Sequence, residues 1–182
     1  MSGVAFTPPA PVSAPSQAAF DALAAQVAAA VPLGTFTVAT LPAPTAAIVG
    51  RLAKVTDLFG DQFDTVRCCA VGTFYFWKPQ SSDSARNFAM TADMLVKPLT
   101  YPQGLRLTGT IGLGTVRKLT LDVEGGWPGC CKEISAGGLG SILGTLNVLG
   151  SGLGSGIGLL TGAYKKFMLD YSGGALSWIQ IV

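Results

Sequence analysis

The most reactive side chains of this 182-residue chain are four cysteines in two adjacent pairs, Cys68–Cys69 and Cys130–Cys131. Zinc sites usually use a C-x2-C spacing, which neither pair has. In a strand, neighbouring side chains face opposite sides of the sheet. We therefore expect one cysteine of each pair in the core and the other facing outward or toward a subunit contact. Because a disulfide within a pair is strained, bridges between pairs or between subunits are the alternative to small buried thiols.

Groups for acid–base chemistry are scarce. The chain has no histidine, which excludes Ser-His-Asp and Cys-His triads and every His-ligated metal site. Glutamate occurs only at Glu124 and Glu133. Asp57, Asp61 and Asp64 lie close together but lack the spacing of a calcium-binding loop, so a solvated loop is the favoured interpretation. We expect no catalytic residues, no metal site and no cofactor.

Three aromatic residues are candidates for facing a ligand. Tyr75 and Trp77 belong to an aromatic stretch, and Trp127 lies in a glycine- and proline-rich turn. Such rings could form a platform for a carbohydrate, although packing in the core is the commoner role of an aromatic strand.

The overall charge is low. Charged residues make up 12% of the chain, against about 25% in a typical domain, and the net charge is +2. The basic residues Arg106, Arg117, Lys118, Lys165 and Lys166 are scattered, so we expect no nucleic-acid partner. The first residues lack the basic and apolar regions of a secretory signal, so synthesis in a cytoplasm is expected.

The elements that would position these residues begin with an arm and a helix. Residues 1–15 are rich in proline, carry no charge and predict an extended arm that docks on another component or stays disordered. Residues 16–34 predict a short oligomerisation helix and the turn that ends it. Its apolar residues recur at intervals of three and four, which is typical of a helix-bundle seam. The seam residues are Phe20, Leu23, Val27 and Ala30.

From residue 35 onward the pattern favours strands. Alternating apolar residues and frequent turns predict a mainly β protein built from antiparallel β-sandwich or small-barrel modules. We place a first β module at 35–100 and a second at 101–182. Residues 66–77 are expected as one strand, and the glycines before Ala175 predict a hairpin tip.

One glycine-rich stretch allows two interpretations. Residues 134–164 contain ten glycines and no charge, with several glycines four residues apart. In a membrane helix this spacing lets two backbones approach closely. Short strands and turns are favoured, because each glycine costs a soluble helix about 1 kcal/mol relative to alanine and no uninterrupted apolar run approaches about 20 residues.

Two stretches resemble modules of tailed-bacteriophage virion proteins. Residues 36–57 match a strand that ends in a Leu-Pro turn followed by a strand that ends in Val-x-Asp, and residues 74–79 suit the closing strand. Residues 105–178, with their Gly-Trp-Pro-Gly turn and the hairpin before Trp178, are similar to the β-rich end modules of phage fibres, spikes and head decorations. Those modules often close with Tyr-Asp-Gly-x-x-Trp, whereas Ser172 stands here in place of the aspartate.

The resemblance implies a non-enzymatic structural protein of a phage or phage-like particle, assembled in the host cytoplasm and usually a homotrimer. Its expected partners are further copies of itself and other virion proteins of the capsid, neck or tail. The arm 1–15 would anchor it to the particle. The alternatives are a receptor- or glycan-binding module at a fibre tip, a membrane-active glycine-zipper protein and, least favoured, an enzyme.

Overall fold

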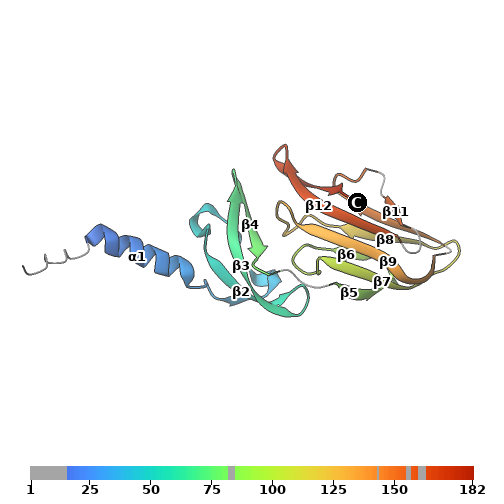
Figure 1. The fold of residues 1–182 in the computed structure, drawn as a ribbon, viewed down its shortest axis with the longest axis horizontal. Coiled ribbons are helices and arrows are strands. Elements are labelled where there is room, and N and C mark those ends of the chain that lie inside the picture. The colour runs from blue at the N-terminus through green and yellow to red at the C-terminus, as the bar shows by residue number, and fades with distance from the viewer. Residues whose placement is uncertain (1–15, 82–84, 143, 155–156, 160–162) are drawn as a thin grey trace, which may run out of the picture.

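The computed structural model describes residues 16–81, 85–142, 144–154, 157–159 and 163–182. The expected anchoring arm, residues 1–15, lies outside the described residues. Along the long axis of the molecule, a helix is followed by a small sheet and then by a larger β unit (Figure 1).

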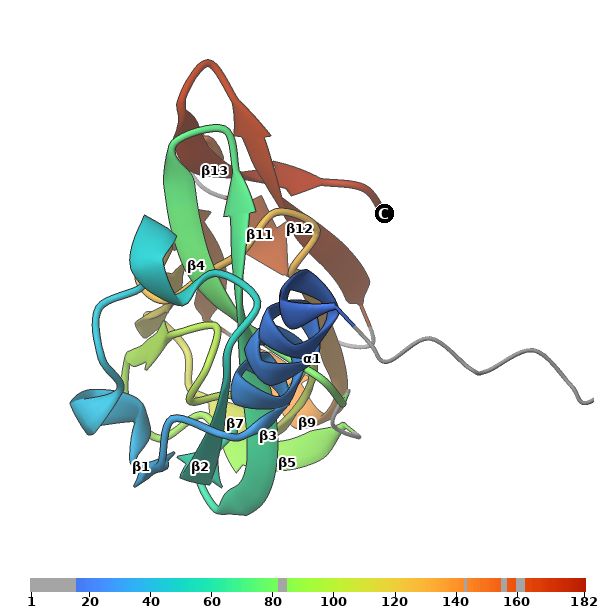
Figure 2. The same ribbon diagram turned by 90° about the vertical axis from the view of Figure 1, so that its left-hand side faces the viewer.

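The helix α1 spans Gln17–Ala30, as the alanine-rich pattern predicts. Ser16 is the N-cap, and its hydroxyl accepts a hydrogen bond from the Ala19 N–H. At the other end the Val31 N–H bonds to the Val27 carbonyl before Pro32 prevents further turns. Viewed along the molecule, α1 stands in front of the first sheet and points away from it (Figure 2).

The first sheet has four strands in the order β1-β2-β3-β4. These strands are β1 (Thr35–Phe36), β2 (Leu52–Leu58), β3 (Gln62–Val71) and β4 (Phe74–Pro79). Two 3-10 turns, Val38–Thr40 and Ala46–Ile48, connect β1 to β2. The inner face packs Ala53, Val55, Val66, Cys68 and Trp77 into one apolar cluster.

The prediction of a single strand at residues 66–77 is wrong. Instead, β3 and β4 form an antiparallel hairpin in which Val71 pairs with Phe74. Gly72 makes the reversal possible because its φ of 59° lies in the left-handed region.

The larger unit is a sandwich of two sheets, ordered β11-β10-β8-β6 and β13-β12-β9-β7-β5. Its strands are β5 (Arg86–Ala89), β6 (Met94–Val96), β7 (Gly104–Ile111), β8 (Val116–Leu121), β9 (Cys131–Ile142), β10 (Thr145–Gly150), β11 (Ile157–Leu159), β12 (Tyr164–Ser172) and β13 (Ala175–Gln180). Both sheets contribute to one core, whose largest members include Trp178, Phe167 and Leu119.

From β5 to β10 the chain alternates between the two sheets. Strands β5, β7 and β9 are therefore parallel neighbours in one sheet, and β6, β8 and β10 are parallel neighbours in the other. The chain thus winds through three successive turns, called coils here, each with one strand in each sheet: β5 with β6, β7 with β8, and β9 with β10. The antiparallel strands β11, β12 and β13 complete the sheets.

The mainly β fold with one N-terminal helix is confirmed. The sheets are mixed, however, because alternation between two sheets makes same-sheet neighbours parallel. The hairpin tip is confirmed as well: Gly173 and Gly174 have φ values of 69° and 85° between the paired Ser172 and Ala175. Such a two-residue turn matches the twist of the flanking strands.

The boundary expected at residue 100 is wrong. Strands β5 and β6 precede it, yet they pair with β7 and β8 of the larger unit. The first sheet thus ends at Pro79. The two units also share packing, because Trp127 contacts both apolar clusters.

Candidate functional site

The predicted oligomerisation seam on α1 lies exposed. Phe20, Leu23 and Val27 are 54%, 57% and 55% exposed, although they are large apolar residues. Ala30 ends the helix, and its side chain lies outside the described part. Within the described residues, no side chain of the β units covers the seam, and α1 projects clear of them (Figure 1). A contiguous apolar stripe of this kind marks an interaction surface.

The cysteines face as the strand alternation predicts. Cys68 and Cys130 are buried, whereas Cys69 and Cys131 are half-buried. All four are free thiols in this chain. The structure therefore contains neither a disulfide within a pair nor one between the two pairs. A bridge between subunits stays a prediction.

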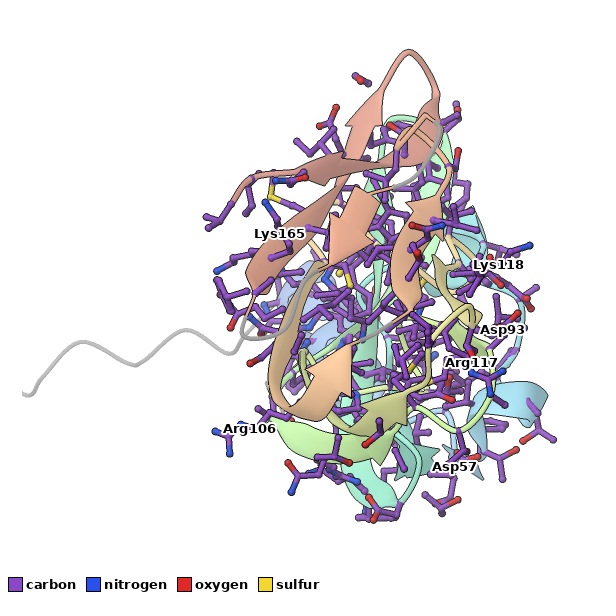
Figure 3. All side chains as sticks on the ribbon, turned by 90° about the vertical axis from the view of Figure 1, so that its right-hand side faces the viewer. Asp57, Asp93, Arg106, Arg117, Lys118 and Lys165 are labelled. Carbon is purple, nitrogen blue, oxygen red and sulfur yellow. The ribbon has the colours of Figure 1, made fainter. Side chains whose placement is uncertain are left out.

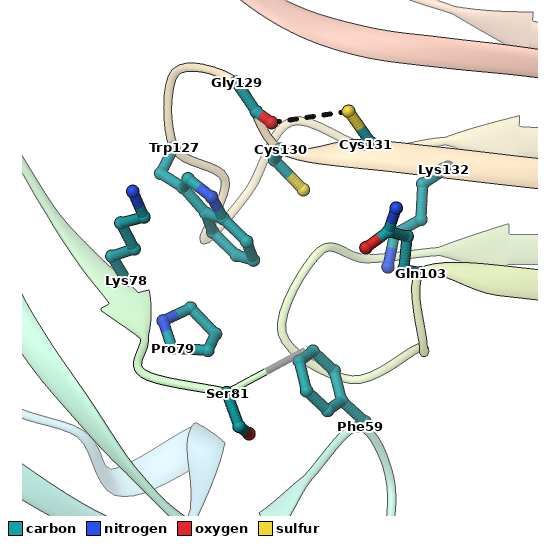
Figure 4. A pocket seen from close by; sticks show the side chains of 10 residues that line it. All are labelled: Phe59, Lys78, Pro79, Ser81, Gln103, Trp127, Gly129, Cys130, Cys131 and Lys132. Atoms are coloured by element: carbon teal, nitrogen blue, oxygen red, sulfur yellow. Dashed lines mark hydrogen bonds between the residues drawn. The ribbon is translucent and has the colours of Figure 1, made fainter. Parts of the chain in front are cut away.

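A cavity of about 200 Å³ lies where the two units meet, beside Cys130 and Cys131 (Figure 4). The indole of Trp127 forms one side, and Lys132 and Gln103 lie opposite (Figure 4). The Cys131 Sγ lies 3.5 Å from the Gly129 carbonyl oxygen. Burial raises the pKa of the Cys130 thiol to about 12, with a smaller opposing effect of Lys132. This thiol is therefore protonated at neutral pH and is a poor nucleophile.

Lys132 is a buried cation that the sequence did not single out. It is 1% exposed, and its Nζ donates to the carbonyl oxygens of Pro98, Tyr101 and Pro102. These carbonyls belong to the loop between β6 and β7. The lysine thus holds in place the loop that lies between the two units. The alternation of side chains along β9 could have suggested that Lys132 points inward.

A groove lies on another side of the junction, with a volume of about 360 Å³. Four consecutive residues of β4, from Phe74 to Trp77, line one side, and Tyr171 and the start of β13 line the other. The rings of Phe74 and Tyr171 stack with their centroids 4.8 Å apart. A second, more polar groove of about 550 Å³ shares Pro44, Trp77, Leu99 and Gly125 with the first.

The three predicted ligand-facing aromatics lie in different places. Tyr75 is half-buried and lines the groove along β4. Trp127 lines the cavity of Figure 4 and packs on both cores. Trp77 borders both grooves but is only 4% exposed, and its Nε1 donates to the Pro42 carbonyl at 2.8 Å. Sequence reasoning did not identify Phe74 and Tyr171, which are far apart in the chain.

The three neighbouring aspartates are not gathered on one point. The Asp57 carboxylate accepts from the Val38 N–H at 2.7 Å. Asp61 pairs with Arg86, and Asp64 accepts from Ser81 and from the Thr65 N–H. Each carboxylate thus has a structural partner of its own.

The labelled basic side chains are dispersed over the molecule. Arg106 and Lys165 lie on one side, whereas Arg117 and Lys118 lie on the other, near Asp93 (Figure 3). The Lys118 N–H donates to the Asp93 carboxylate at 2.9 Å. These basic residues do not form one patch.

The glycine-rich stretch is not a helix in its described residues. Residues 134–142, 145–150 and 157–159 belong to β9, β10 and β11. The membrane-helix alternative for this stretch is therefore wrong, because its backbone bonds run between strands. Within the described part of the chain, no helix has the length and apolarity needed to cross a membrane.

Comparisons with protein-family models, with curated protein sequences and with solved structures found no match to this chain. The sequence pattern and the geometry of these surfaces therefore carry the functional argument.

Proposed function

We propose that the protein is a non-enzymatic structural component of a tailed-phage virion or phage-like particle, and that it assembles as a homotrimer through α1. The observation that carries this proposal is the exposed seam of Phe20, Leu23 and Val27. In the trimer the three seams face one another, and the β units project from the helical bundle as a small fibre, spike or decoration.

The energetics of α1 support association. A helix of 14 residues is marginal in water by itself. Full burial of a leucine, valine or phenylalanine side chain contributes about 1.5–3 kcal/mol. Phe20, Leu23 and Val27 each still have more than half of their surface to bury. Packing three copies together therefore stabilises both the helix and the oligomer.

Two further features support the virion role. Residues 36–57 and 74–79, which resemble a module of tailed-phage virion proteins, lie within one sheet and its connections. The coils of β5 to β10 make a unit wound along one direction, as stacked repeat architectures are. In this proposal the protein is part of the virion, assembled in the host cytoplasm, with capsid, neck or tail proteins as its other partners.

The test is the native mass of the full chain by light scattering, in detergent-free buffer with and without reductant. We expect the mass of three chains. Leu23→Asp places a charge in the seam and should give the mass of one chain. Ala25→Asp is the matched control, because helical periodicity places residue 25 opposite the seam, and it should leave the mass unchanged.

A monomeric wild-type protein would contradict the proposal. A trimer that survives Leu23→Asp would show that association uses another surface. Loss of the trimer on reduction would assign an intersubunit bridge to the half-buried cysteines, Cys69 and Cys131.

A further inference from the structure

The groove between the two units follows the edge of a strand. Its lining includes Phe74, Tyr75, Phe76 and Trp77 in succession, and successive strand residues point to opposite faces. Both faces of β4 can border one groove only at the edge of that strand. β4 is the last strand of its sheet, and no described strand pairs with its far edge.

The chemistry of the groove favours an uncharged, extended ligand. None of the described residues that line it carries a charge. The stacked rings of Phe74 and Tyr171 and the half-buried ring of Tyr75 provide flat apolar surfaces. The Trp77 N–H is already bonded to Pro42. The lining therefore offers few side-chain partners for the many hydroxyls of a sugar, which makes a peptide the better fit.

Proline-rich peptides suit such a surface. They are preformed in an extended helix without internal hydrogen bonds, and they dock in aromatic-lined grooves at a small entropic cost. A free strand edge adds main-chain groups that an extended peptide can bond.

We propose that this groove binds the proline-rich arm, residues 1–15, of another copy of the protein. The arm is uncharged, like the groove, and four of its residues are prolines: Pro8, Pro9, Pro11 and Pro15. This inference rests on the proposed assembly function, and it names a partner for the arm.

The position of α1 favours another copy as the source. The arm precedes the N-terminal end of α1, and this end of the helix lies on the side away from the β units (Figure 1). The arm spans about 46 Å if each of its residues extends about 3.1 Å, whereas α1 is only about 21 Å long. The arm therefore joins the chain at the end of α1 that is farther from its own β units, and it is long enough to reach the groove of a molecule that lies beside that end.

The test measures binding of a fluorescently labelled synthetic peptide of residues 1–15 by anisotropy. Its target is the full chain with the four arm prolines changed to serine, so that its own arm does not compete. We expect saturable binding, and no binding of a peptide with the same proline-to-serine changes.

A matched pair of variants locates the site. Ala175 is exposed and lines the groove, so Ala175→Glu should weaken peptide binding about tenfold or more by placing a charge there. Ala89 is also an exposed strand alanine, and it lines neither of the two grooves nor the cavity of Figure 4, so Ala89→Glu should leave binding unchanged.

The source of the arm is tested with a native arm in the Leu23→Asp protein. If the arm comes from another copy, dilution empties the groove, and peptide affinity rises to that of the serine-substituted chain. If the native arm still prevents peptide binding at every dilution, the arm occupies the groove of its own chain, and the proposal is overturned.

Two other results would overturn it: no peptide binding, or equal binding to Ala175→Glu and Ala89→Glu. Binding of glucan or galactan oligosaccharides that Ala175→Glu abolishes, without peptide binding, would assign the groove to a glycan. Because native mass is measured separately, failure of the arm proposal is distinguishable from failure of trimerisation through α1.

Discussion

The ammonium nitrogen of Lys132 lies 2.9 Å from the carbonyl oxygen of Pro102, inside the junction between the two β units. Pro98 and Tyr101 supply further carbonyl acceptors from the same loop. Carbonyl groups turned inward toward a cation need that cation to remain satisfied. The loop that joins β6 to β7 is therefore built around one charged side chain.

Lys132→Met should destabilise the protein by about 3 kcal/mol, because it leaves buried carbonyl groups without their donor. Urea unfolding measures the loss. Lys118→Met is the control, since Lys118 is exposed, and its effect should stay within about 0.5 kcal/mol. Similar stability of the two variants would contradict a structural role for Lys132.

The pair of Lys166 and Glu133 predicts a pH dependence. The Lys166 Nζ lies 2.9 Å from the Glu133 carboxylate, and this hydrogen bond is the main cause that holds the pKa of Glu133 below its ordinary value of 4.5. The same bond raises the pKa of Lys166 above 10.5. A lowered carboxyl pKa stabilises the fold above the unfolded pKa, and a raised lysine pKa stabilises it below the unfolded pKa.

The pair therefore stabilises the fold fully at pH values between the unfolded pKa of Glu133, 4.5, and that of Lys166, 10.5. This stabilisation is lost as the pH falls from 4.5 through the folded pKa of Glu133, or rises from 10.5 through that of Lys166. Unfolding of wild type and Glu133→Gln, compared across pH, should show a wild-type advantage at pH 7 that disappears in acid. An advantage that persists below both carboxyl pKa values would mean that packing, not charge, explains it.

The thiols should differ in their rates of alkylation. At pH 8 only about 1 in 10,000 Cys130 side chains is a thiolate when its pKa is about 12. Burial is also the main cause that raises the pKa of Cys68. In reductant-treated native protein, mass spectrometry should find iodoacetamide adducts first on Cys69 and Cys131. All four should react in guanidinium, and early modification of Cys130 would contradict the buried position.

Substitutions at two glycines, Gly144 and Gly158, distinguish the strand structure from a glycine-zipper helix. A Cβ on Gly144 would lie 2.1 Å from the Thr115 carbonyl oxygen, so Gly144→Ala should cost about 3 kcal/mol or more. No described atom lies within 4 Å of a Cβ built on Gly158, so Gly158→Ala should be nearly neutral. A zipper would be damaged by both, and thermal unfolding of the two variants tells these outcomes apart.

Local features were predictable from the sequence. Ser16 and the alanine-rich run indicate α1, and the paired glycines before Ala175 indicate the β12–β13 turn. The alternate burial of Cys68 and Cys69 also follows, because alternation within a strand needs no knowledge of its neighbours.

Relations between distant segments were not predictable in the same way. Alternation shows which face of β7 is buried, but not that β5 and β9 lie beside it. Likewise, the stack of Phe74 on Tyr171 joins residues with no shared local pattern. The turn at Gly72 was missed because the apolar residues on its two sides read as one continuous strand.

The coils formed by β5 to β10 have a consequence for the evolution of the protein's size. Each coil adds one strand to each sheet, and neighbouring strands are about 4.8 Å apart. Duplication of the segment that encodes a coil would thus lengthen the body by that fixed increment and leave the two ends intact. The width of the two sheets would thus depend on the number of coils and would change by one strand spacing with each coil gained or lost.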